Sequence, residues 1–104
     1  MFQIFVYIPE SHLEKVKNAM FAAGAGKLGE YDSCAWQVRG EGQFRPLSGS
    51  APFLGETDQL EKVSEYRIEL LCSDEKIGAT LKAMHSAHPY EEPAFGVIKL
   101  HLPA

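Results

Sequence analysis

The chain has 104 residues, of which 45% are hydrophobic and 23% are charged, and its formal net charge is −4. This length and balance predict one folded domain over residues 1–104 and exclude a wholly disordered chain. The acidic balance disfavours binding to a nucleic-acid backbone, and no apolar run is long enough for a membrane helix. Two distant cysteines and a start without a basic signal-peptide region predict a cytoplasmic protein with reduced thiols, although composition alone leaves a single disulfide open.

The N-terminal third predicts a strand, a helix and a second strand. Residues 2–8 are dense in β-branched and aromatic side chains, which favours a strand with apolar residues on both faces. Ser11 and Glu14 have the spacing of a capping box ahead of an apolar helical repeat, and Gly24 follows that repeat. We therefore expect a helix that ends at Gly24 and a second strand over 33–39.

The rest of the chain predicts a loop, a strand, a helix and a last strand. Residues 40–55 are rich in Gly, Pro and Ser, and residues 62–72 alternate between apolar and charged side chains. We expect Ser73 to cap a second helix, Pro89 to end it, and 94–102 to form the last strand. The order predicts an α+β, ferredoxin-like βαββαβ sandwich with a four-stranded antiparallel sheet and two helices on one face.

In such a fold, one face of the sheet has no helix over it. We expect this face to be aromatic and charged, which is typical of an interface with a second copy of the chain. The alternative is that the long loop over 41–60 folds across the sheet. The predicted interface residues are Phe5, Tyr7, Glu65, Arg67 and Glu69, with Phe95 and Val97 added if the parity of the last strand holds.

Three further features are interpreted as structural. Residues 24–29 match the G-x-G-x-x-G pattern, but they follow a helix instead of opening one, which favours a tight turn over a nucleotide site. Cys34 is expected to be a small core residue and Trp36 a core residue instead of a stacking platform. No nucleophile with an ordered base is found, so no catalytic residue is predicted.

The most unusual string is the histidine-, tyrosine- and glutamate-bearing segment over 88–93, which two prolines stiffen. The predicted topology brings it to the same end of the sheet as the turn after the first strand and the 41–55 loop. These residue types could bind a divalent metal or a small ligand. The alternative, which we favour over catalysis, is a rigid loop with solvated carboxylates. The candidate ligand-binding residues are His12, His88, Tyr90, Glu91 and Glu92.

Motifs along nearly the whole chain carry a family resemblance. They are the glycines of 24–29, the Gly/Pro pattern of 40–55, Glu65-x-Arg67-Ile68-Glu69 and the segment over 88–94. Together they resemble the CutA-like insert domain of the YqfO proteins, a dimetal-binding, Ngg-one-interacting-factor-three-like family. The resemblance implies a CutA- or PII-like fold that trimerises with its sheets facing inward. It also implies metal ligands in a flanking domain, and because none of them matches a residue here, no metal or catalytic residue is carried over.

Three functions follow as hypotheses. The first is a stand-alone, non-catalytic interaction or regulatory module that self-associates, as a trimer by resemblance or as a dimer. The second is a sensor of a small ligand or a divalent metal that uses the loop around His88. The third is a module that acts in trans with a protein bearing the dimetal domain. No cofactor is predicted, and a divalent metal is the one inorganic ligand that the sequence suggests.

Overall fold

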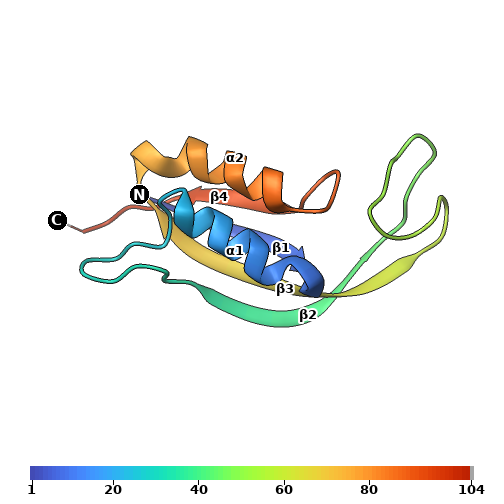
Figure 1. The fold of residues 1–104 in the computed structure, drawn as a ribbon, viewed down its shortest axis with the longest axis horizontal. Coiled ribbons are helices and arrows are strands. Elements are labelled where there is room, and N and C mark those ends of the chain that lie inside the picture. Colours follow the sequence, from blue (N-terminus) through green and yellow to red (C-terminus); the bar gives the residue numbers. More distant parts are fainter. Residues whose placement is uncertain (104) are drawn as a thin grey trace.

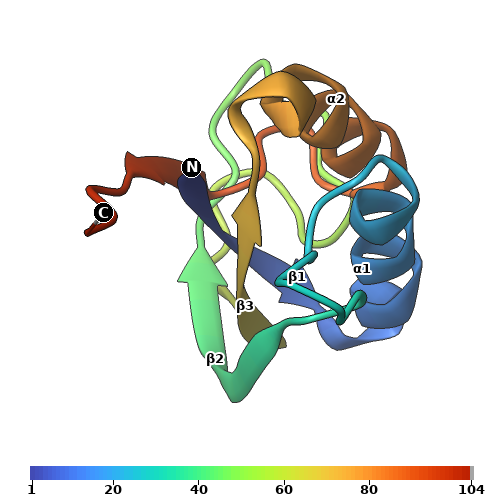
Figure 2. The ribbon, with the colours of Figure 1, turned by 90° about the vertical axis from the view of Figure 1, so that its left-hand side faces the viewer.

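The computed structural model, which describes residues 1–103, contains a sheet layer and a helix layer (Figure 1). The strands are β1 (Phe2–Pro9), β2 (Trp36–Phe44), β3 (Glu61–Cys72) and β4 (Phe95–Lys99), and the helices are α1 (Leu13–Ala22) and α2 (Ile77–Ala87). All pairings are antiparallel and the strand order is β2-β3-β1-β4. Both helices lie on the same face of the sheet (Figure 2). The predicted ferredoxin-like α+β architecture is confirmed.

The core lies between this face and the helices. The alternation in β1 and β3 is confirmed, because every second residue over 4–8 and over 68–72 is turned toward α1 and α2 and is fully or almost fully buried. These core residues are Ile4, Val6, Ile8, Ile68, Leu70 and Cys72 from the strands, and Val16, Met20 and Met84 from the helices. Among the helices of residues 1–103, none is long and apolar enough to cross a membrane.

The starts of the two helices differ from the prediction. Short 3-10 turns, Glu10–His12 and Asp74–Lys76, lead into α1 and α2. Ser11 places its hydroxyl 2.8 Å from Nδ1 of His12, and neither it nor Ser73 caps a helix through its side chain. The predicted caps are therefore wrong, and the packing of the apolar helix faces stabilises α1 and α2 instead.

The glycine-rich exit of α1 behaves as predicted. Gly24 has φ +114° and Gly26 has φ +78°, a backbone region that residues with a side chain rarely adopt. A Cβ atom on Gly26 would lie 2.7 Å from the ring of Phe21. The G-x-G-x-x-G pattern is thus a turn that leaves a helix, and not the start of a nucleotide-binding helix.

β2 is an outer strand of the sheet, and, contrary to the prediction, neither Cys34 nor Trp36 is a core residue. It spans Trp36–Phe44 where 33–39 was predicted, so Cys34 lies before it. Trp36 is 56% exposed, because it lies on an outer strand and its register with β3 turns it to the side of the sheet that has no helix. Both cysteines are free, with Cys34 half-buried and Cys72 buried.

The register of β4 corrects the predicted parity. Phe5 lies opposite Gly96, so that Phe95 and Val97 point to the helix side of the sheet. There the ring of Phe95 packs edge-on against His85 of α2, at 5.1 Å between centroids. Phe95 and Val97 are therefore not part of the uncovered face.

The β2–β3 hairpin extends beyond the rest of the sheet. β1 ends where Pro9 pairs with Glu65, so residues 61–64 pair with β2 alone. The molecule is accordingly elongated, with extents of 50 × 24 × 23 Å, and the loop over 45–60 stands at its far end (Figure 1). This loop covers only the end of the helix-free side of the sheet, near Tyr7 and Glu65, and leaves Trp36 exposed.

Candidate functional site

Two features could carry function, and the first is the uncovered side of the sheet, called here the open face. Arg67 lies at its centre. The Arg67 guanidinium is 4.3 Å from the centroid of Phe5 and 5.4 Å from that of Tyr7. It donates hydrogen bonds to the Tyr7 hydroxyl at 2.7 Å and to the Glu69 carboxylate at 3.0 Å. The open face consists of Phe5, Tyr7, Trp36, Val38, Arg67, Glu69 and Ile98.

The bonds around Arg67 hold a charged group over two aromatic rings. The hydrogen bond to Glu69, followed by the one to Tyr7, raises the pKa of Arg67 above its ordinary value. Its charge is compensated within the chain by Glu69. The centre of the open face is thus a preformed aromatic and ionic platform.

Exposed apolar side chains surround this platform. Val38 lies directly opposite Arg67 in the register and is 45% exposed, while Trp36 lies opposite Glu69. Ile98, on the other outer strand, is also 45% exposed. These three residues were not predicted as interface residues, although the Trp36-x-Val38 alternation places two of them on one face. Of the five predicted interface residues, four meet here and Glu65 lies further along the sheet.

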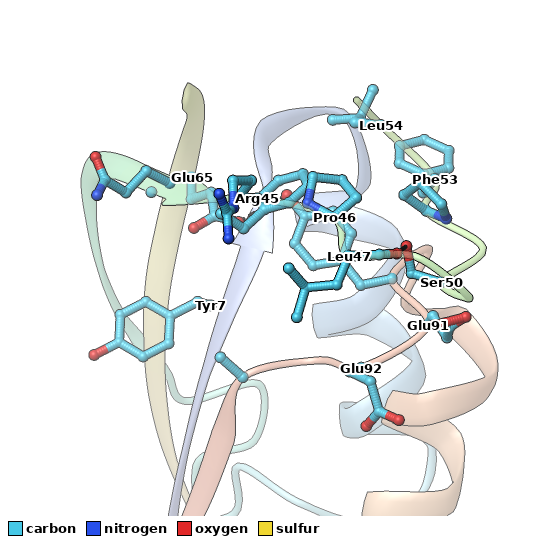
Figure 3. A pocket seen from close by; sticks show the side chains of 16 residues that line it. Tyr7, Arg45, Pro46, Leu47, Ser50, Phe53, Leu54, Glu65, Glu91 and Glu92 are labelled. Atoms are coloured by element: carbon cyan, nitrogen blue, oxygen red, sulfur yellow. Dashed lines mark hydrogen bonds between the residues drawn. The ribbon is translucent and has the colours of Figure 1, made fainter. Parts of the chain in front are cut away.

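The second feature is a cleft of about 450 Å³ at the far end of the open face. The sheet forms one wall, the loop over 45–54 covers it, and the turn before β4 completes it (Figure 3). Figure 3 shows Leu47 between Tyr7 on the sheet side and Glu92 on the turn side. The side chains that line it include Tyr7, Phe44, Arg45, Leu47, Phe53, Glu65, Tyr90, Glu91 and Glu92.

Tyr90 organises the cleft. Its hydroxyl donates a hydrogen bond to Glu65 at 2.7 Å, and its ring lies 5.9 Å from Phe44 and 6.4 Å from Phe53, between centroids. Burial, followed by the hydrogen bond to Glu65, raises the pKa of Tyr90, so the phenol stays protonated. Glu91 accepts a hydrogen bond from the Ala51 amide at 3.0 Å, which ties the covering loop to the turn.

The predicted ligand residues come together in part. As predicted, the turn after β1, the long loop and the 88–93 segment are neighbours: the ring of His12 lies 5.3 Å from that of Phe53. Tyr90, Glu91 and Glu92 line the cleft, whereas His12 and His88 do not.

His88 is buried and holds the backbone together. Its Nδ1 accepts the Tyr90 amide at 3.1 Å, and its Nε2 lies 2.8 Å from the Tyr7 carbonyl oxygen. Since both ring nitrogens have backbone partners, His88 has no free nitrogen for a ligand. Across residues 1–103, no three His, Cys, Asp or Glu side chains are grouped so that they could hold a metal ion.

The fold comparisons define the class of protein. CutA from Archaeoglobus fulgidus, a periplasmic divalent cation tolerance protein, superposes with a TM-score of 0.68 at 15% identity, covering 100% of this chain and 88% of that one. CutA1 from Pyrococcus horikoshii gives 0.70 at 15% identity, covering 100% and 87%. The chain is therefore a CutA/PII-like module in its fold.

Sequence similarity then gives the family. The chain is 45% identical over 95 residues to a GTP cyclohydrolase 1 type 2 homolog of Mycobacterium leprae and 42% identical to that of Bacillus subtilis. A Bacillus cereus protein related to NIF3 superposes with a TM-score of 0.80 at 38% identity, covering 95% of this chain. No family model matches. The chain is thus related to the NIF3/YqfO family, and it spans about a quarter of the length of these relatives.

Proposed function

We propose that this chain is an interaction module that self-associates through its open face. The observation that carries the proposal is the exposure of Trp36, Val38 and Ile98 on the same uncovered side of the sheet. Full burial of an exposed apolar side chain contributes about 1.5–3 kcal/mol, and these three residues are about half exposed, so covering the rest of their surface favours association. A trimer is the expected assembly by family resemblance, and a dimer is the alternative.

The charged residues of the open face suit a buried interface. Taking an unpaired charge out of water is costly, but Arg67 already bonds to Glu69 and to Tyr7 within one chain. The aromatic rings beneath the guanidinium replace part of its hydration. Association would therefore cover a compensated pair and not two isolated ions.

Sedimentation velocity on Val38→Lys tests this proposal. The substitution places an ammonium group at the centre of the open face, directly opposite Arg67, and burying that charge between two chains is costly, so the assembly should dissociate toward the 11.5 kDa chain. The matched control is Leu28→Lys, because Leu28 is 56% exposed but lies in the turn before β2. A wild-type chain that stays monomeric, or a Val38→Lys variant that assembles like the control, would refute the role of the open face.

A second candidate follows from the length of the relatives. We propose that the module works beside a dimetal-binding domain, since the matched region is about a quarter of each related protein. Co-purification with a separately expressed dimetal domain of the family tests this. The expected result is a complex of the two proteins, which Val38→Lys leaves intact if the dimetal domain binds outside the open face. A mixture that elutes as two separate species would contradict the proposal.

A further inference from the structure

We propose that the cleft at the far end of the sheet binds a small organic cation, that is, an amine or ammonium group carried on an apolar body. This site lies within one chain, so it does not depend on self-association. Three independent properties of the cleft support the assignment: its walls, its charge and its aromatic rings.

The walls suit an apolar body. The cleft measures about 450 Å³, within the range of small-molecule sites. Leu47, Phe53 and Phe44 contribute apolar side chains, and the loop that carries Leu47 and Phe53 is held in place by the bond from Ala51 to Glu91. Leu47 and Phe53 are 57% and 47% exposed. A bound apolar group would cover surface that now faces water.

The charge of the cleft favours a cation. Three carboxylates, Glu65, Glu91 and Glu92, line it against a single guanidinium, that of Arg45. Glu65 is half-buried, and its hydrogen bond comes from the neutral hydroxyl of Tyr90. None of the ion pairs found over residues 1–103 involves these carboxylates. A partly buried carboxylate without a basic partner is costly, and a ligand cation would compensate it.

The aromatic rings provide a second attraction for the same charge. The rings of Phe44 and Phe53 both lie near that of Tyr90, tilted by 58° and 50° to it. The face of an aromatic ring attracts an ammonium group, most strongly where water is excluded. An anionic ligand would gain nothing from these faces and would meet three carboxylates. The combination therefore selects for positive charge on a hydrophobic molecule.

Calorimetric titration of the full chain with three matched probes tests this proposal. The probes are phenethylammonium, 2-phenylethanol and phenylacetate, which share a ring and differ in charge. We expect phenethylammonium to bind about tenfold more tightly than 2-phenylethanol, and phenylacetate to bind weakest. The affinity of the cation should fall as salt is raised, since its charge lies near exposed carboxylates.

Two variants locate the binding. Glu65→Gln removes the charge but keeps an oxygen that can accept the Tyr90 hydroxyl, so we expect a loss of about five- to tenfold for the cation and little change for the alcohol. Phe53→Leu keeps an apolar side chain and removes a ring face, and it should also weaken the cation selectively. The control is Glu30→Gln, an exposed glutamate at the opposite end of the molecule.

Three results would overturn the proposal. They are the absence of phenethylammonium binding, equal affinity for the amine and the alcohol, and equal affinities in Glu65→Gln and Glu30→Gln. Thermal unfolding of each variant separates a lost site from a lost fold. Sedimentation of the same samples tests self-association separately from cation binding. A Glu65→Gln variant that assembles normally but no longer binds the cation supports both the cleft proposal and the independence of the two properties.

Discussion

Replacing His88 with alanine should disconnect the turn before β4 from β1. The Tyr90 amide can only donate, so Nδ1 of His88 must accept and Nε2 carries the proton that is donated to the Tyr7 carbonyl. The substitution leaves one part-buried backbone donor and one part-buried acceptor without partners, each at a cost of about 1–3 kcal/mol. We therefore expect the free energy of unfolding to fall by about 2–6 kcal/mol.

The same contacts predict how stability depends on pH. Burial is the main cause that lowers the pKa of His88, and the nearby charges of His12 and His85 lower it further. Below about pH 6.5 the unfolded chain takes up a proton at this residue that the folded chain does not. Acidification from that pH should therefore destabilise the fold, by at most about 1.4 kcal/mol per pH unit for this one group.

Urea unfolding followed by tryptophan fluorescence and circular dichroism, from pH 5 to pH 7.5, measures both effects. His88→Gln removes the titration and retains a donor for the Tyr7 carbonyl, so its stability should change less with pH than that of the wild type. His101→Gln is the control, because His101 is exposed near the C-terminus. Equal pH slopes in wild type and His88→Gln, or a stability that rises on acidification in the wild type alone, would refute the reasoning.

Two glycine substitutions give further predictions. Gly78→Ala in α2 should raise the free energy of unfolding by about 0.5–1 kcal/mol, because a Cβ there meets no atom within 4 Å and alanine favours the helix; a lower melting temperature would contradict this. Gly96→Ala should lower the free energy by about 1–3 kcal/mol and weaken self-association, because its Cβ would lie 2.3 Å from the Phe5 ring that stacks under Arg67. Gly40→Ala is the control, because a Cβ on Gly40 meets no atom within 4 Å. Equal melting temperatures for Gly40→Ala and Gly96→Ala would argue against close packing of the Phe5 ring on Gly96.

Local periodicity determined the element order and most of the core. Ile68 and Leu70 were assigned to one face of a strand because side chains alternate along it, and both are buried. Val16 and Met20 were assigned to one side of a helix by their spacing, and both are buried as well. The proximity of the 88–93 segment to the long loop followed from the strand directions alone.

Contacts distant in sequence decided the rest. The register of β4 against β1 turns Phe95 and Val97 to the helix side of the sheet. A register shifted by one residue would have placed both side chains on the open face. The outer position of β2 exposed Trp36, although an isolated tryptophan in a strand pattern favours a core position.

The use of each polar side chain also depended on its surroundings. In the sequence, His88 has the features of a residue that binds a ligand. In the structure it is buried and both ring nitrogens bond to the backbone, so its role is structural. Glu65 was predicted to lie in the interface, but it accepts a hydrogen bond from the Tyr90 hydroxyl and lines the cleft. Composition and spacing determine which side chains can lie on a face, whereas only the packed chain determines which of their donors, acceptors and charges are already satisfied, and the unsatisfied ones are what a ligand or a partner can use.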